Sequence, residues 1–82
     1  MNENSKYFAF VPIMPDGKPA PAVMLEKDLI DFLRMYELGI KNPGNTLRYY
    51  RECGKLKPTR IGGRNAYTLD AVMEFLEKMT KK

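Results

Sequence analysis

The stretch that decides the fold is NPGNTLRYYRECGKLKPTRIGGRNAY, residues 42–67. It opens with Asn42 and Pro43. This pair is typical of a helix start, because asparagine accepts a bond from a first-turn N–H and proline fits the first helical position. Gly54 follows, and glycine is the residue that most often takes the left-handed conformation at a helix end. The stretch therefore predicts a short helix over residues 43–53.

This predicted helix has one narrow apolar side. Leu47 and Tyr50 lie three residues apart on it, and Cys53 continues it, so we expect all three to face the core. Because Tyr49 is adjacent to Tyr50, it must point towards solvent instead. The remaining sides are polar, basic and aromatic, and their candidate contact residues are Asn45, Thr46, Arg48, Tyr49 and Arg51.

A β-hairpin is predicted next. Gly62 and Gly63 separate two short runs, residues 59–61 and 64–66. A two-residue Gly-Gly loop suits the primed turns that join antiparallel strands, since both positions can take positive φ. Such a tip can approach a phosphate backbone closely because it carries no side chain. The candidate contact residues of the hairpin and its approach are Lys55, Lys57, Arg60, Gly62, Gly63, Arg64 and Asn65.

Positive charge is concentrated in this part of the chain. From Lys41 to Arg64 there are seven basic residues and one acid, Glu52, so the segment has a formal charge of +6. The whole chain has +4, so the remaining residues are negative in sum. Each charge has an ordinary explanation, such as an Arg48–Glu52 surface pair or a soluble edge hairpin. Together they indicate a polyanionic partner.

The order of these features resembles the MerR and excisionase group of winged helix-turn-helix proteins. The likeness rests on TLRYYR at residues 46–51, the glycine and basic hairpin that follow, and Tyr67 before a further helix. It covers about the C-terminal two-thirds of the chain. The resemblance implies an α+β fold of three helices with a β-hairpin wing, and sequence-specific binding of double-stranded DNA.

In that interpretation the predicted helix enters a major groove. Asn45, Thr46 and Arg48 would reach base edges, since asparagine suits adenine and arginine suits guanine through paired hydrogen bonds. The wing would follow the neighbouring backbone or a narrow minor groove, whose negative potential favours arginine. The residues expected at phosphates and along the wing are Tyr49, Arg51, Lys55, Arg60, Arg64 and Asn65.

Two departures from the group refine the expectation. The turn between the first two helices, residues 39–46, is longer by about two residues than the usual tight turn. No long dimerising helix follows the last predicted helix. The second departure favours an excisionase-like recombination factor or a small transcriptional regulator over an effector-sensing regulator. A module this small reads a short site, so we expect a homodimer or a cooperative assembly on DNA.

The flanking segments predict a scaffold. Residues 25–38 form an amphipathic helix that buttresses the second helix. The last helix begins near Thr68, a suitable N-cap, and Tyr67 is expected to pack where the wing meets it. The apolar positions on which these predictions depend are Leu25, Leu29, Phe32, Leu33 and Tyr36 in the first helix, and Val72, Phe75, Leu76 and Met79 in the last.

Residues 1–23 lie outside the resemblance and are expected to form an extension before a domain at 24–82. An apolar aromatic run at 7–14 precedes the turn signal Pro15-Asp16-Gly17, and prolines at 19 and 21 suit an edge strand or extended arm. Packing on its own domain is the favoured interpretation. A dimerisation arm is the alternative, because an apolar edge can pair with a second chain.

Composition excludes several classes of protein. The chain of 82 residues is one domain with a single cysteine, which fits a reducing, cytoplasmic location without disulfides. Histidine is absent and one cysteine cannot build a zinc site, so we expect neither an enzyme nor a cofactor or metal. No apolar run has the roughly 18 residues needed to cross a bilayer. Two alternatives to duplex DNA binding remain. One is a protein-interaction adaptor on the same scaffold, and the other is RNA binding, which the positive charge alone does not exclude although the helix and wing pattern favours duplex DNA.

Overall fold

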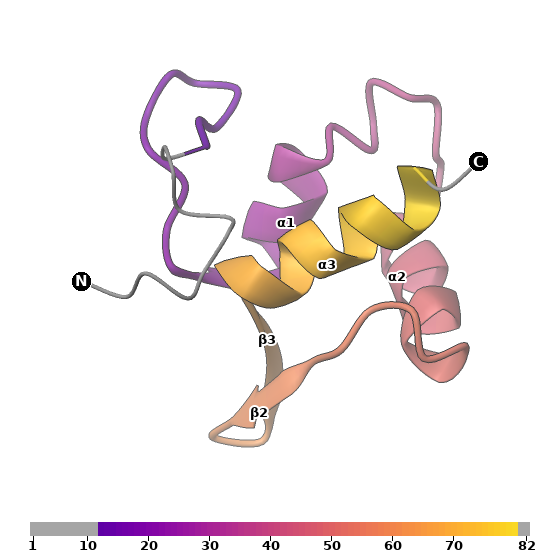
Figure 1. The fold of residues 1–82 in the computed structure, drawn as a ribbon. Coiled ribbons are helices and arrows are strands. Elements are labelled where there is room, and N and C mark those ends of the chain that lie inside the picture. The colour runs from indigo at the N-terminus through magenta and orange to yellow at the C-terminus, as the bar shows by residue number, and fades with distance from the viewer. Residues whose placement is uncertain (1–11, 81–82) are drawn as a thin grey trace.

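The computed structural model describes residues 12–80 and shows an α+β fold (Figure 1). Three helices surround the inner end of a three-stranded antiparallel sheet with strand order β1-β3-β2. The elements in chain order are β1 (Val23–Leu25), α1 (Glu26–Phe32), α2 (Pro43–Glu52), β2 (Thr59–Ile61), β3 (Arg64–Thr68) and α3 (Leu69–Thr80). The predicted three helices and hairpin are therefore present.

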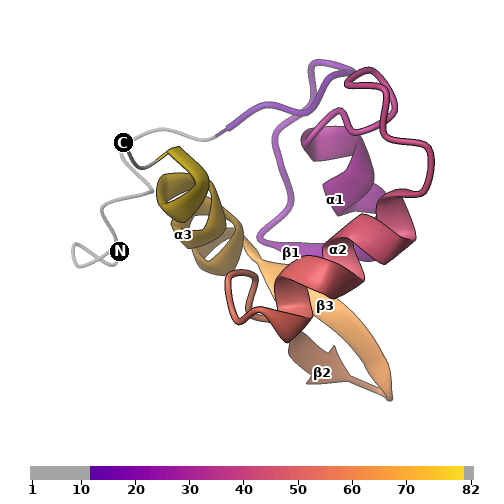
Figure 2. The same cartoon turned by 90° about the vertical axis from the view of Figure 1, so that its right-hand side faces the viewer.

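Strand β3 is the centre of the sheet, but its two neighbours pair with different parts of it. β1 pairs with the inner part, where Met24 is opposite Tyr67, and β2 pairs with the outer part, where Arg60 is opposite Asn65. Only Ala66 has a partner on both sides. The sheet thus begins inside the core and ends in solvent, as Figure 2 shows from a second direction.

The core fills the space between the helices and the inner part of the sheet. Tyr67 and Met24 are opposite each other on neighbouring antiparallel strands, so their side chains lie on the same face of the sheet. The helices cover this face, and both side chains are fully buried. The other large, fully buried side chains are Leu29, Leu47, Leu56 and Val72. Strands β1 and β3, the three helices and the α2–β2 connection therefore all contribute side chains to one small core.

Helix α2 forms as the sequence predicts. The side chain of Asn42 accepts a hydrogen bond of 3.2 Å from the backbone N–H of Asn45, and Pro43 is the first helical residue. Leu47 is fully buried, and the ring of Tyr50 contacts that of Phe75 edge-on at 5.1 Å. Gly54 has a φ of 81°, which is the left-handed conformation expected after the helix.

The hairpin and the start of α3 also match their predictions, but of the apolar positions expected in the last helix Met79 is 42% exposed. Gly62 and Gly63 have φ values of 58° and 79°, so both central residues of the turn are left-handed, as a type I′ turn requires. The hydroxyl of Thr68 accepts a 3.1 Å hydrogen bond from the N–H of Ala71 and caps α3. Since Thr68 is also the last residue of β3, the strand continues directly into the helix.

The first helix is much shorter than predicted. The apolar spacing indicated a helix over residues 25–38, but α1 ends at Phe32, and Leu25 belongs to β1. Arg34 takes a φ of 56°, which no regular right-handed helix allows, and it reorients the chain. Met35 consequently enters the core, while Tyr36 is 66% exposed. The placement of Tyr36 on the buried face was therefore wrong, and so was that of Leu25, which is 50% exposed.

Ten residues, 33–42, connect α1 to α2, so this connection is longer than the modest extension that the sequence indicated. Cys53 is a further correction, because it is exposed rather than buried. Cys53 keeps a helical backbone conformation, with φ of −78° and ψ of −9°, but it lies six residues after Leu47 and is therefore turned about 120° away from it around the helix axis. Tyr50 is half-buried at the edge of the core.

The N-terminal extension folds back on its own domain within the described residues. Ile13 and Pro19 form an antiparallel bridge around the predicted turn, Ala20 is buried, and Met14 packs against the core. Val23 already belongs to β1, so the expected boundary between residues 23 and 24 falls inside a strand. The first residues of the aromatic run, 7–11, lie outside the described residues.

Candidate nucleic-acid interface

Helix α2 and the β2–β3 hairpin extend from the same side of the core. In Figures 1 and 2 the hairpin and the C-terminal part of α2 form the lower part of the molecule, and the α2–β2 connection joins them. Fully buried Leu56 anchors that connection, and its N–H donates to the carbonyl of Tyr50 at 3.2 Å. The relative position of helix and hairpin is thereby fixed in part by the core.

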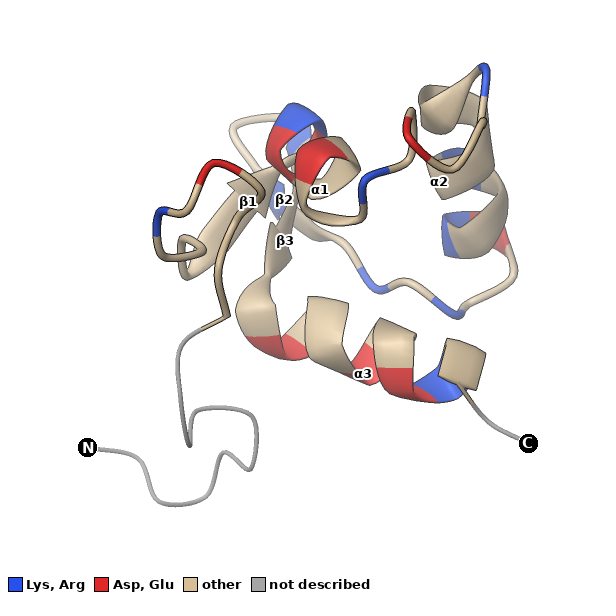
Figure 3. Ribbon diagram, turned by 90° about the horizontal axis from the view of Figure 1, so that it is seen from above, with Lys and Arg blue, Asp and Glu red and all other residues tan. Residues whose placement is uncertain are grey.

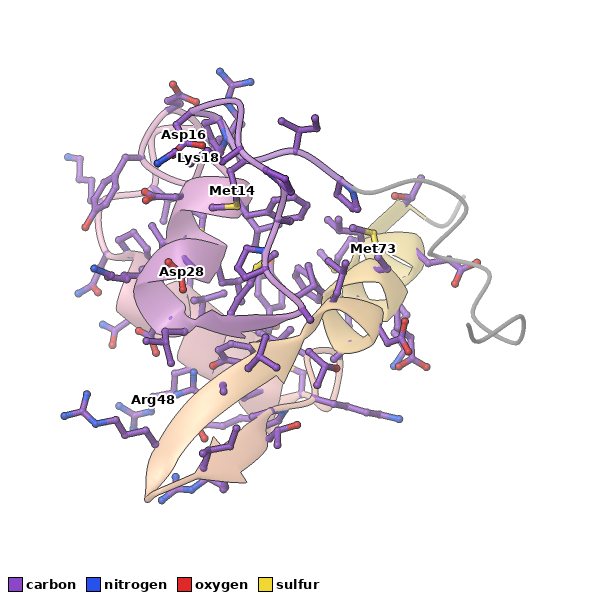
Figure 4. All side chains as sticks on the ribbon, turned by 90° about the vertical axis from the view of Figure 1, so that its left-hand side faces the viewer. Met14, Asp16, Lys18, Asp28, Arg48 and Met73 are labelled. Carbon is purple, nitrogen blue, oxygen red and sulfur yellow. The ribbon has the colours of Figure 1, made fainter. Side chains whose placement is uncertain are left out.

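The outward side of α2 presents a short set of polar groups. Asn45 is exposed, and its side chain has no role in capping the helix. Arg48 is exposed and lies 3.3 Å from Glu52 through its Nε, the i, i+4 pair that the spacing allowed. Figure 4 shows Arg48 pointing away from the core, in the part of the view where the hairpin lies. Such an exposed ion pair contributes about 0–1 kcal/mol to stability, so Arg48 can leave Glu52 for another partner at little cost.

Thr46 and Tyr49 differ in what they offer. The hydroxyl of Thr46 donates to the carbonyl of Asn42 at 3.3 Å, and the residue is half-buried. Tyr49 is 60% exposed, as predicted. A hydrogen bond with Cys53 is the main cause that raises the pKa of the Tyr49 hydroxyl above its ordinary value. Tyr49 therefore presents an exposed side chain next to Arg48 on the outward side of α2.

Arg51 does not face outward, which departs from its predicted role at a phosphate. Its Nη1 donates a 2.8 Å hydrogen bond to the hydroxyl of Tyr67 and lies 3.8 Å from Oε1 of Glu26. Only 19% of its side chain is exposed. Burial is the main cause that raises the pKa of Tyr67, while the bond from Arg51 acts in the opposite direction. Arg51 thus belongs to the interior of the site.

The hairpin carries the outer basic groups. All three residues of β2 are exposed, and Arg60 donates a long hydrogen bond of 3.4 Å to Asn65 across the strands. Within residues 12–80, no salt bridge involves the basic side chains of the hairpin and its approach, which are Lys55, Lys57, Arg60 and Arg64. These four cations have no carboxylate to neutralise them there.

Charge is separated across the molecule. Figure 3 shows basic residues on α2, on the connection after it and at the sheet, whereas the residues of α3 that it marks in red form an acidic row. The acids of α3 are Asp70, Glu74 and Glu77. The sequence predicted this asymmetry, and the fold places its basic part on the helix and hairpin that extend from the core.

Two contributors to the site were missed by sequence reasoning. Glu26 pairs with Arg51 from 25 positions away, and no local pattern indicates that contact. Ile61 is 55% exposed beside the Gly-Gly tip, where it adds an apolar side chain to a basic hairpin. A search for apolar residues next to the predicted turn would have singled it out. Of the twelve predicted site residues, Arg51 is the one that the fold turns inward.

Comparison of the chain with known protein families, with curated proteins and with solved structures found no match. Among the described residues there is no group of three His, Cys, Asp or Glu side chains placed to hold a metal ion. None of the helices in residues 12–80 is long and apolar enough to span a membrane.

Proposed function

We propose that this protein binds double-stranded DNA as a small winged helix-turn-helix protein. One observation carries the proposal: a capped helix and a glycine-tipped hairpin extend from the same side of the core, and the segment that forms them has a formal charge of +6. A duplex is a dense linear array of negative charge, so such a surface gains affinity by releasing counterions. A helix of this size also fits a major groove.

The proposed contacts follow the exposed side chains. Asn45 and Arg48 reach base edges, with adenine and guanine as their preferred partners. On binding, Arg48 gives up its exposed ion pair with Glu52 and forms hydrogen bonds with the base instead. Thr46 is at the edge of this set because its hydroxyl already has a backbone acceptor. The residues proposed at phosphates and in the adjacent groove are Tyr49, Lys55, Lys57, Arg60, Arg64 and Asn65.

In this proposal the cellular role is that of an excisionase-like recombination factor or a small transcriptional regulator. Both roles need short-site recognition by a compact protein, and both suit cooperative or dimeric binding. Once duplex binding has been measured, selection of bound sequences from random DNA identifies the recognised site. For either role we propose a cytoplasmic location.

Fluorescence anisotropy on a 20-bp duplex of mixed sequence, across a salt series, tests the proposal. With about five phosphate contacts, log K is expected to fall with log salt at a slope of about −4.5. Arg60→Ala and Arg64→Ala should each reduce the magnitude of the slope by about one. Lys78→Ala on α3 is the matched control, since it removes the same charge away from the hairpin. A flat salt response, or equal effects of all three variants, would contradict the proposal.

A protein-interaction adaptor is the second candidate, and a hollow of about 250 Å³ favours it. The hollow lies between the N-terminal hairpin and the α1–α2 connection, with Met14, Met35 and Tyr36 in its lining. Tyr36 and Leu38 expose large apolar surfaces on that connection. Absence of duplex binding at low salt, together with pull-down of a protein partner that Tyr36→Ser abolishes, would support this candidate.

A further inference from the structure

The contact between Arg51 and Tyr67 differs from the other side-chain pairs of the surface. The Arg34–Glu37, Arg48–Glu52 and Arg60–Asn65 pairs join residues three to five positions apart. Arg51 and Tyr67 are 16 positions apart, and their 2.8 Å bond connects the last turn of α2 to the inner part of β3. It is therefore a direct connection between the helix and the strand that carries the hairpin.

Glu26 adds the third element to this connection. Its Oε1 lies 3.8 Å from Arg51, at the start of α1. Its Oε2 lies so close to the first turn of α2 that a Cβ built on Gly44 would be only 3.3 Å away. Gly44 and Arg51 are seven residues apart and so share one side of the helix. Glycine at position 44 lets this carboxylate approach α2 along the side that carries Arg51.

We propose that Arg51 and Tyr67 are positioning residues, which set the angle between α2 and the β2–β3 hairpin so that both can engage one duplex. The inference rests on the DNA-binding function proposed above and deepens it. Arg51 acts through α2 and Tyr67 acts through the hairpin, and neither contacts a phosphate. The buried, neutral hydroxyl of Tyr67 is the fixed point, since Tyr67 is itself held against Met24 in the core.

The chemistry of the pair suits this role. A hydrogen bond from a charged donor is stronger than a neutral one, and partial burial removes the water that would compete for it. Burial is the main cause that raises the pKa of Tyr67, and the phenolic oxygen accepts the hydrogen bond from Arg51. The planar guanidinium can also face Tyr67 and Glu26 together in one orientation, which a single ammonium group does less well.

A positioning role and a phosphate contact make opposite predictions about salt. A residue that contacts phosphate changes the slope of log K against log salt when it is removed. A positioning residue keeps the binding-competent arrangement populated, so its loss weakens binding at every salt concentration, but the complex that forms has the same phosphate contacts and the same slope. Tyr67→Phe is the sharpest variant, because it removes one oxygen atom, keeps the packed ring and changes no charge at neutral pH.

The test measures duplex affinity across the salt series for wild type, Tyr67→Phe, Arg51→Met and Arg51→Lys. Tyr67→Phe and Arg51→Met are expected to lose about tenfold in affinity, or about 1.4 kcal/mol, with a slope equal to that of wild type. Arg51→Lys keeps a cationic donor and should recover part of the loss. Lys55→Met is the matched control for Arg51→Met, and it should reduce the slope by about one. A slope reduced by one in Arg51→Met would overturn the positioning role.

A second measurement needs no DNA. Spin labels on the native Cys53, which is exposed after α2, and on Ile61→Cys at the hairpin report the distance between helix and wing. Tyr67→Phe and Arg51→Met should broaden the distance distribution, and Arg51→Lys should narrow it again. An unchanged distribution in folded Tyr67→Phe would overturn the positioning role. If wild type binds no duplex, DNA binding fails as the function, while the distance distribution still decides whether the pair positions the wing.

Discussion

The two ends of β3 show how one strand serves two purposes. At the inner end, Tyr67 pairs with Met24 of β1, and both are fully buried. At the outer end, Arg64 pairs with Ile61 of β2, and both are exposed. The inner end depends on burial against helices from distant parts of the chain, whereas the outer end depends on the two glycines of its turn. Stability and the proposed binding are therefore separable along a single strand.

The largest effect is expected at the inner end. Tyr67→Ala removes a large, fully buried side chain and should destabilise the protein by about 3–5 kcal/mol. Urea denaturation followed by circular dichroism measures this loss. Arg64→Ala on the outer end is the control and should change the unfolding free energy by less than about 0.5 kcal/mol. Comparable losses in the two variants would show that the ends are not separable.

An intermediate effect is expected at the hairpin tip. Gly63→Ala places a Cβ on a residue with a φ of 79°, where nothing within 4 Å would clash, so the cost comes from the backbone conformation alone. The loss should be about 1–2 kcal/mol, confined to the hairpin. Hydrogen exchange should show faster exchange in residues 59–66, with the amides of α3 unaffected. Gly63→Asn is the control, since asparagine tolerates this conformation better; an equal loss there would point to another cause.

The smallest effect is expected from pH. Because burial raises the pKa of Tyr67 in the folded state, the folded protein binds this proton more tightly than the unfolded chain does. The associated stability is complete below the ordinary tyrosine pKa of about 10 and is lost as pH rises through the folded-state value. Denaturation at alkaline pH should show a steeper decline in wild type than in Tyr67→Phe. If the free energy of unfolding declined equally in the two proteins, burial at the inner end would not raise the pKa of the Tyr67 hydroxyl.

How far the fold could be predicted depends on the range of the interactions that form each element. The predictions of helix α2 and of the hairpin were correct because the residues that define these elements act on their immediate neighbours. These residues are Asn42, Pro43, Gly62 and Gly63. The end of α1 was missed because Arg34 takes a left-handed conformation without the glycine that usually signals it. Met35 replaces Tyr36 in the core for the same reason, since the reversal changes which side chain points inward.

The candidate site divides in the same way. Exposure of Tyr49 and Arg48 followed from the burial of Leu47, because helical spacing fixes which side each residue occupies. The inward position of Arg51 did not follow, because its partners Glu26 and Tyr67 come from α1 and β3. Charge counting alone assigned Arg51 to the partner, whereas the fold uses it internally. A basic segment therefore overstates the number of cations that a ligand can meet.

The pairing of β1 with β3 also has a consequence for the order of folding. Val23 is paired with Thr68 across 45 positions of the chain, whereas Thr59 and Ala66 are only seven apart. Loop-closure entropy favours the short-range pairing first, so we expect the hairpin to form early and β1 to dock late. During synthesis β1 must wait until residue 68 has left the ribosome. The chain thus completes its core only after its wing has been made.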